Sequence, residues 1–202
     1  MKQYTLIPII GFILFIILYV VAASLYPGGS EIDRFARGFS LRHNYWCDLL
    51  QYKSENGQTS PSRPVAILAL GILSLSLALF WLIMPPRLTK KVLTKRTIQS
   101  TGMVSMLILF FLQAESHDII LNIASITGCI AIASMIYLLF RAGLYVLFSM
   151  GVVGILLLAL NIYIYYSKTG IYYLPLIQKF SFALLLLWFT LICLRKYPKI
   201  QD

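Results

Sequence analysis

The amino-acid sequence predicts an all-α integral membrane protein: one domain, a six-transmembrane-helix bundle with an amphipathic helical first extracytoplasmic loop. Hydrophobic residues make up 59% of the 202 positions and charged residues 12%, whereas about a quarter of a soluble domain is charged. The apolar residues form blocks close to the ~20 residues that cross a bilayer. Most basic residues stand at the ends of these blocks, where positive charge sets topology. A soluble core could not bury this much apolar surface, so we expect lipid to surround the helices.

The six helices follow from the apolar blocks in order. The first block is longer than the apolar region of a signal peptide and only Lys2 precedes it, so we expect a retained helix. Pro64 fits the first turn of the second helix. One helix from Asp118 to Tyr166 would be roughly 70 Å long, over twice the hydrocarbon thickness, so the chain must turn at Gly143. The predicted helices cover about 6–25, 64–84, 97–114, 117–140, 144–166 and 174–194, with a long loop at 26–63.

The distribution of basic residues selects one orientation. With the N-terminus inside, the cytoplasmic segments hold ten basic residues and one acid, Asp202, and the other side holds seven basic and six acidic residues. The reverse orientation would place the all-basic segment 85–96 outside. We therefore expect an integral protein of the cytoplasmic (inner) membrane with both termini cytoplasmic and the first loop extracytoplasmic. The net charge of +10 forms no folded basic face, so we expect no nucleic-acid partner.

The first loop, 26–63, is predicted to form a helical lid. Ser30 and Asp33 have the spacing of a capping box, and Ser40 can begin a second helix with an apolar stripe. The stripe and the residues beside it are Leu41, Tyr45, Trp46, Asp48, Leu49 and Tyr52. Such a helix lies on the membrane interface or folds over the bundle. Packing alone explains the lid, and the alternative is a lid that gates a ligand, with Tyr45, Trp46 and Asp48 facing it.

A polar pocket is predicted beneath this loop. Asp118, Asn122, Asn161 and Lys179 fall at similar depth in three predicted helices, with His117 at the rim. Polar groups in hydrocarbon usually face the bundle interior or water, and we expect an Asp118–Lys179 pair at the centre. The same residues also suit hydrogen bonds that only join helices.

Four residues are candidates for catalysis: His43, His117, Asp33 and Asp118. His117 and Asp118 are adjacent, about 100° apart on a helix, and cannot pair with each other. A pairing of His43 with Asp118, or of His117 with Asp33, stays open. His43 and Cys47 could share a helix face but lack the four ligands of a structural zinc site, and no hydrolase elbow or zincin motif occurs. We therefore expect no metal and no cofactor, and the sequence leans away from an enzyme.

The segments YPGGS, GFS, NYWCDLL, SRP and HDIILNIAS carry a resemblance. With them the chain resembles bacterial multi-pass membrane proteins of unknown function, the domain-of-unknown-function family nine-nine-eight. The resemblance covers nearly the whole chain. It implies a six-helix bundle in a bacterial cytoplasmic membrane, and it supplies no activity and no catalytic residues.

Three functions are consistent with the sequence. The first is binding of a lipid headgroup or a small polar ligand in the predicted pocket, covered by the first loop. The second is a membrane-embedded hydrolase or transferase that acts on lipids at the extracytoplasmic side. The third is a structural or partner-binding subunit. The expected partners are membrane lipids and either a second copy of the chain or another membrane protein.

Overall fold

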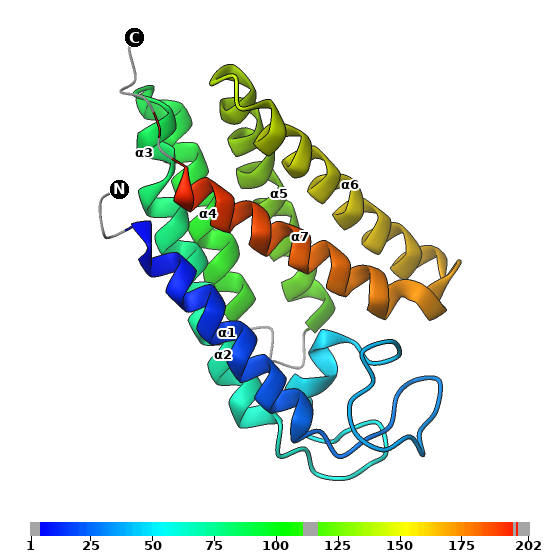
Figure 1. Cartoon of the computed structure of the whole chain (residues 1–202). Helices are drawn as coiled ribbons and strands as arrows, with labels where there is room; N and C mark the ends of the chain where they lie inside the picture. The colour runs from blue at the N-terminus through cyan, green and yellow to red at the C-terminus, as the bar shows by residue number, and fades with distance from the viewer. Residues whose placement is uncertain (1–4, 111–116, 196, 198–202) are drawn as a thin grey trace.

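The computed structural model describes residues 5–110, 117–195 and 197, and within these ranges it is all-helical, with no strand (Figure 1). Two short 3-10 helices, η2 (Trp46–Leu50) and η3 (Ile171–Tyr173), accompany the α-helices. The α-helices are α1 (Ile7–Ser24), α2 (Arg63–Ile83), α3 (Pro85–Leu88), α4 (Val92–Phe110), α5 (His117–Arg141), α6 (Tyr145–Ser167) and α7 (Leu174–Leu194). The predicted turn at Gly143 is confirmed, with a left-handed φ of 69°.

Five helical segments of the described chain are long and apolar enough to cross a membrane. They comprise α1, α2 with α3, most of α5, α6, and η3 with α7. The predicted all-helical architecture with membrane-length apolar helices is therefore confirmed, while a sixth span stays a prediction. Of the six predicted spans, α4 is the one that is not among these five segments. It begins at Val92 rather than 97 and so includes Lys95 and Arg96. Long unbranched side chains such as these favour helix.

The long helices pack in chain order. Each one contacts the next along the chain, and α7 returns to contact α1, which leaves a seam between the first and last helices. In Figure 1, α1 begins and α7 ends at the same end of the bundle, and the loop between α1 and α2 lies at the other. We call these the terminal end and the loop end.

An aromatic cluster fills the core where α1, α2 and α7 meet. The Phe189 ring lies 4.8 Å from Phe80, 5.6 Å from Trp81 and 6.4 Å from Phe12, centroid to centroid. Trp188 is fully buried, and its Nε1–H donates to the Leu147 carbonyl at 2.7 Å, which joins α7 to α6. Buried aromatic pairs of this kind contribute packing energy beyond their area.

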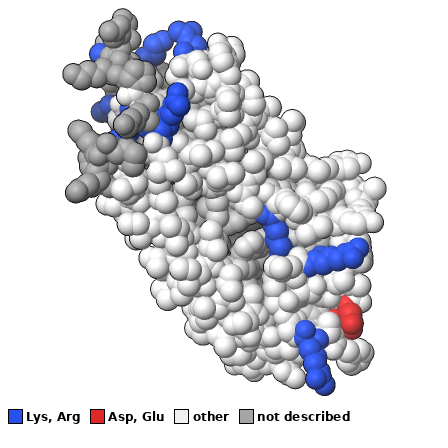
Figure 2. Space-filling view, viewed as in Figure 1, with Lys and Arg blue, Asp and Glu red and all other residues white. Residues whose placement is uncertain are grey.

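The surface has a wide uncharged belt. On the face that Figure 2 shows, basic side chains lie at the terminal end, further charged side chains lie from the middle toward the loop end, and most atoms between them are uncharged. Large hydrophobic side chains on the long helices point outward, among them Leu75, Val20 and Leu156. A contiguous apolar belt of this size is unusual on a soluble monomer, whereas lipid solvates it at no cost.

The loop is not the pair of α-helices that the sequence predicts, and that prediction is wrong. Its one regular element is η2, within turns and two isolated bridges, Gly28–Arg37 and Lys53–Thr59. The predicted apolar stripe is split, because Leu49 is fully buried while Leu41 is exposed.

Side chains that compete with the backbone explain this outcome. Asp33 N–H donates to Ser30 Oγ at 3.1 Å and His43 N–H donates to Ser40 Oγ at 3.2 Å, so each serine accepts the hydrogen bond expected of a cap, while the Asp33 carboxylate bonds to Phe35 instead of Ser30. Each closes a turn instead of a helix, as short polar side chains often do. Gly29 adds a tertiary constraint. It has a φ of +85°, and a Cβ there would lie 2.4 Å from the Asn56 nitrogen, so the backbone packs against backbone at this point.

Candidate functional site

Trp46 in η2 fills the seam between α1 and α7 at the loop end. Its ring lies 3.8 Å from Tyr19 and 6.1 Å from Phe15 on α1, and 5.3 Å from Phe182 on α7. The Trp46 backbone carbonyl accepts a hydrogen bond from the Tyr19 hydroxyl. The Trp46 backbone N–H donates to Gln178 Oε1 at 3.3 Å. The loop is therefore bonded to both helices of the seam.

Asn44 organises the loop beneath the seam. It is fully buried, and its Nδ2 donates to the Gly29 carbonyl and to Asp48 Oδ2, both at 2.8 Å. Its Oδ1 accepts from the Ser40 N–H at 2.9 Å. Both amide hydrogens and the amide oxygen are thus satisfied, as a buried polar side chain requires.

Asp48 is a buried carboxyl held by hydrogen bonds. Besides the Asn44 amide, its Oδ2 accepts the Tyr45 N–H at 3.0 Å. Burial raises the pKa of Asp48 to about 6, and the hydrogen bonds from Asn44 and Tyr45 oppose that rise. Burial also raises the pKa of the neighbouring Cys47 thiol to about 11, so Cys47 is a thiol at neutral pH and a poor nucleophile.

Lys179 reaches this cluster from α7. Its Nζ donates to the Asn44 carbonyl at 2.5 Å and to the Pro175 carbonyl at 3.1 Å, and it lies 5.5 Å from the centre of the Phe39 ring. Among the described residues these two carbonyls are its hydrogen-bond partners, and both are neutral. An ammonium group has three donors, and described partners accept two of them from this half-buried cation.

The side chains of His117 and Asp118 lie outside what the structure describes, although α5 begins at His117. The predicted Asp118–Lys179 pair and the pairings of His43 with Asp118 and of His117 with Asp33 therefore stay predictions.

His43 and Asp33 have described surroundings, and the two do not meet. His43 Nε2 lies 3.1 Å from the Tyr172 hydroxyl, and the Arg42 guanidinium lies 5.3 Å from the centre of the same ring. Asp33 is exposed, and its Oδ1 accepts the Phe35 N–H at 2.9 Å within its own turn. His43 therefore joins the loop to η3, and Asp33 shapes the loop.

Asn122 and Asn161 each bond to a neighbouring helix. Asn122 on α5 exchanges two hydrogen bonds with the Tyr166 hydroxyl on α6, at 2.8 and 3.1 Å. Asn161 on α6 donates to Ser181 Oγ on α7 at 2.7 Å. In the described part of the chain both asparagines thus join helices, and Lys179 meets the loop instead. A common pocket with Asp118 stays a prediction.

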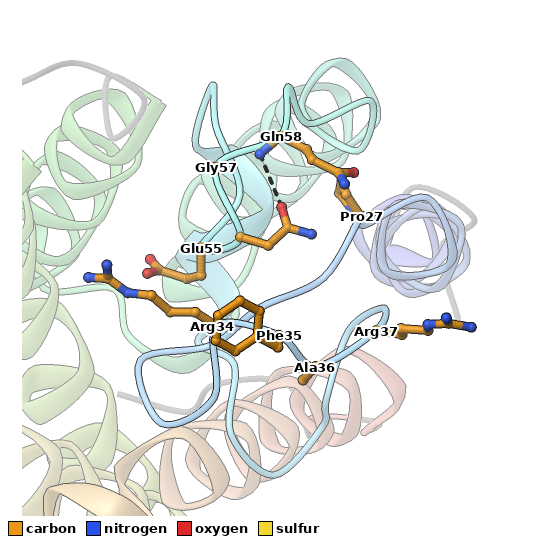
Figure 3. A pocket seen from close by; sticks show the side chains of 9 residues that line it. Pro27, Arg34, Phe35, Ala36, Arg37, Glu55, Gly57 and Gln58 are labelled. Atoms are coloured by element: carbon orange, nitrogen blue, oxygen red, sulfur yellow. Dashed lines mark hydrogen bonds between the residues drawn. The ribbon is translucent and has the colours of Figure 1, made fainter.

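A hollow on the loop surface lies between the segments 34–37 and 55–58. Figure 3 shows that Arg34 and Arg37 point in opposite directions, with the Phe35 ring between them and Glu55 on the Arg34 side. Because the charged groups diverge, the hollow presents no set of groups that converge on one ligand. Among the described residues no three His, Cys, Asp or Glu side chains are grouped to hold a metal ion.

The site includes residues that the predicted pocket left out. Tyr19, Asn44 and Gln178 supply the bonds that hold Trp46 and Lys179 in place. Tyr19 and Gln178 are polar residues near the loop ends of apolar blocks, and that position is a usable signal. Asn44 has no comparable signal, because it is one polar residue among many in the loop.

No family model, no curated protein and no solved structure matches the chain. The fold defines the protein as an all-helical chain with membrane-length apolar helices. The resemblance to the bacterial family nine-nine-eight stays a prediction.

Proposed function

We propose that this protein is an integral protein of the cytoplasmic membrane that binds an anionic headgroup, from a lipid or a small polar ligand, at Lys179. The observation that carries the proposal is the environment of that side chain. Lys179 stands on a membrane-length helix, is half-buried, and bonds to two neutral carbonyls. Charged residues within membrane helices are costly and commonly serve function.

An anion is the ligand that this environment favours. Asp48 lies close enough to interact electrostatically with Lys179. Asn44 bonds to both groups, because its carbonyl binds Lys179 and its amide binds Asp48. A phosphate oxygen would accept the remaining N–H of Lys179 and form a charge-assisted hydrogen bond. Arg42 lies over the Tyr172 ring in η3, just before α7, and adds positive charge at the loop end.

The proposal includes six spans, both termini in the cytoplasm, and the loop end outside. For α4 the support comes from its hydroxyls: Thr97, Ser100 and Thr101 each donate to the carbonyl four residues earlier, at 3.0, 2.7 and 2.8 Å. Polar groups satisfied within their own helix can face lipid. Lys95 and Arg96 stand in the first turns of α4, where long basic side chains reach the headgroups.

The test measures stabilisation of the detergent-solubilised protein by phosphatidylglycerol and by glycerol phosphate. We expect both to raise the Tm of the wild type, and Lys179→Met to weaken their binding about tenfold or more, the loss of one charge-assisted hydrogen bond. Lys168→Met is the matched control. This lysine lies just after α6, at the same end of the bundle, and contacts Tyr165.

Two outcomes would contradict the proposal. One is equal binding by Lys179→Met and wild type. The other is that no anion stabilises the wild type while Lys179→Met unfolds more easily. Lys179 would then serve only to hold the loop against α7.

A further inference from the structure

The seam between α1 and α7 is a less extensive contact than that between any two long helices that follow each other along the described chain. Direct contact between the two helices is aromatic, with Phe12 lying 6.4 Å from Phe189 and Phe15 lying 5.5 Å from Phe182. From Phe15 toward the loop end, Trp46 stands between the helices. One side chain from the loop therefore closes this half of the seam.

The closure is held by hydrogen bonds, one of which involves Lys179 itself. Tyr19 and Gln178 bond to the backbone of Trp46, and Lys179 bonds to the carbonyl of Asn44, two residues before it. An anion that accepts the third N–H of Lys179 attracts the same ammonium group that donates to the Asn44 carbonyl, and so weakens that hydrogen bond. Binding of a headgroup and loosening of the loop are therefore coupled.

Trp46 is also incompletely satisfied where it lies. Its Nε1 is buried and has no hydrogen-bond partner among the described residues, although a buried indole N–H usually finds one. An unpaired buried donor costs free energy, so the indole gains a hydrogen bond when it moves toward the headgroup region. Figure 2 shows the surface hollowed on the face where α1, α7 and the loop meet.

We infer that the ligand is a membrane lipid that reaches Lys179 sideways through the α1–α7 seam, with an acyl chain in the place that Trp46 now fills between Phe15 and Phe182. This inference rests on the proposed function and names its ligand class. A soluble anion needs no opening in the bundle wall. A lipid does, because its chains stay in the hydrocarbon while its headgroup reaches Lys179.

The experiment uses Trp46 as the reporter. The chain has three tryptophans, so Trp81→Phe with Trp188→Phe leaves Trp46 alone. The solubilised protein is titrated with phosphatidylglycerol and with phosphatidylcholine, each brominated on its acyl chains, because bromine quenches a nearby indole. The same titration of Trp46→Phe, which keeps the two buried tryptophans, gives the complementary signal if the double variant does not fold.

We expect brominated phosphatidylglycerol to quench Trp46 to a plateau, and Lys179→Met to raise the midpoint about tenfold. Brominated phosphatidylcholine should quench without a plateau, and Trp46→Phe should lose the saturable phase. The inference is overturned if the two lipids quench alike, or if Lys179→Met has no effect. If glycerol phosphate still binds in a Lys179-dependent manner, the proposed function survives and the sideways route alone fails. If neither lipid nor glycerol phosphate binds, both fail.

Discussion

Asn44 is one of the residues that join the loop to the helices. Its side chain makes three hydrogen bonds and its carbonyl accepts the Lys179 ammonium. Its partners Asp48 and Gly29 are themselves buried. Truncation at position 44 therefore leaves their polar atoms without this hydrogen-bond partner and without water in its place.

Asn44→Ala is expected to lower the free energy of unfolding by roughly 2–4 kcal/mol, because buried partners left unpaired cost about 1–3 kcal/mol each. Denaturant unfolding of the solubilised protein measures this. Asn56→Ala is the control, since the bonds of the Asn56 side chain within the described chain are local, to Ser54 and Gln58. Equal losses in the two variants would contradict the role assigned to Asn44.

Asp48 gives the folded protein a dependence on pH. Its pKa is raised from 3.8 to about 6 by burial, so the folded state holds this proton more tightly than the unfolded state. The stability that it contributes is therefore fully present below a pH of about 4 and is lost as the pH rises through about 6. Well above pH 6 Asp48 is ionised in both the folded and the unfolded state, so it no longer makes the free energy of unfolding depend on pH.

Asp48→Asn tests this sign. An amide oxygen can still accept from the Asn44 amide and the Tyr45 N–H, and no charge is buried at high pH. We expect Asp48→Asn to be more stable than the wild type at pH 7.5 by about 2 kcal/mol and similar to it at pH 4. Unfolding at both pH values measures the difference, and a gap that widens toward low pH would contradict the account.

At the scale of elements, the helices depend on close approach at small residues. Gly102 on α4 lies against Trp81 on α2, and a Cβ at position 102 would stand 2.4 Å from the indole ring. Small residues at such crossings let membrane helices approach each other. The α2–α4 pair therefore has little room for a larger side chain.

Gly102→Ala is expected to destabilise the protein by about 1–3 kcal/mol, the usual cost of overpacking. Gly71→Ala in α2 is the matched control, because among the described residues a Cβ there meets only a Phe110 ring carbon, at 3.5 Å. There the better helix propensity of alanine should leave stability unchanged or raised. Thermal unfolding compares the two variants. A Gly71→Ala protein less stable than the Gly102→Ala protein would contradict the close approach of α2 and α4 at Gly102.

The elements also show what the sequence can and cannot predict. Helix positions follow from apolar blocks of membrane length, a local property of the chain. The loop does not, because Gly29 packs against Asn56 and Asn44 bonds to Gly29, and such contacts have no local pattern. Lys179 stands out by its depth in an apolar block, yet its partner Asn44 lies 135 residues away. Pairings of that kind come only from the fold.

The whole molecule is asymmetric between its two ends. The terminal end carries the basic segment around α3 and the start of α4, and the loop end carries the site. Single cysteines test the proposed sidedness after Cys47, Cys129 and Cys193, all free thiols, are replaced by serine or alanine.

We expect Gln58→Cys, in the exposed loop, to react with a membrane-impermeant maleimide in intact spheroplasts. Lys91→Cys, exposed before α4, should react only after the membrane is permeabilised. Reaction of both without permeabilisation, or the opposite pattern, would contradict the proposed topology.

The proposed function rests on Lys179, and the most direct measurement is whether the purified protein keeps a bound anionic lipid through this side chain. Native mass spectrometry of the protein purified in mild detergent reads out bound lipid by mass. The account predicts a retained anionic phospholipid on the wild type and on Lys168→Met, and its loss from Lys179→Met. Retention that is equal in all three proteins, or no anionic lipid on the wild type, would contradict it.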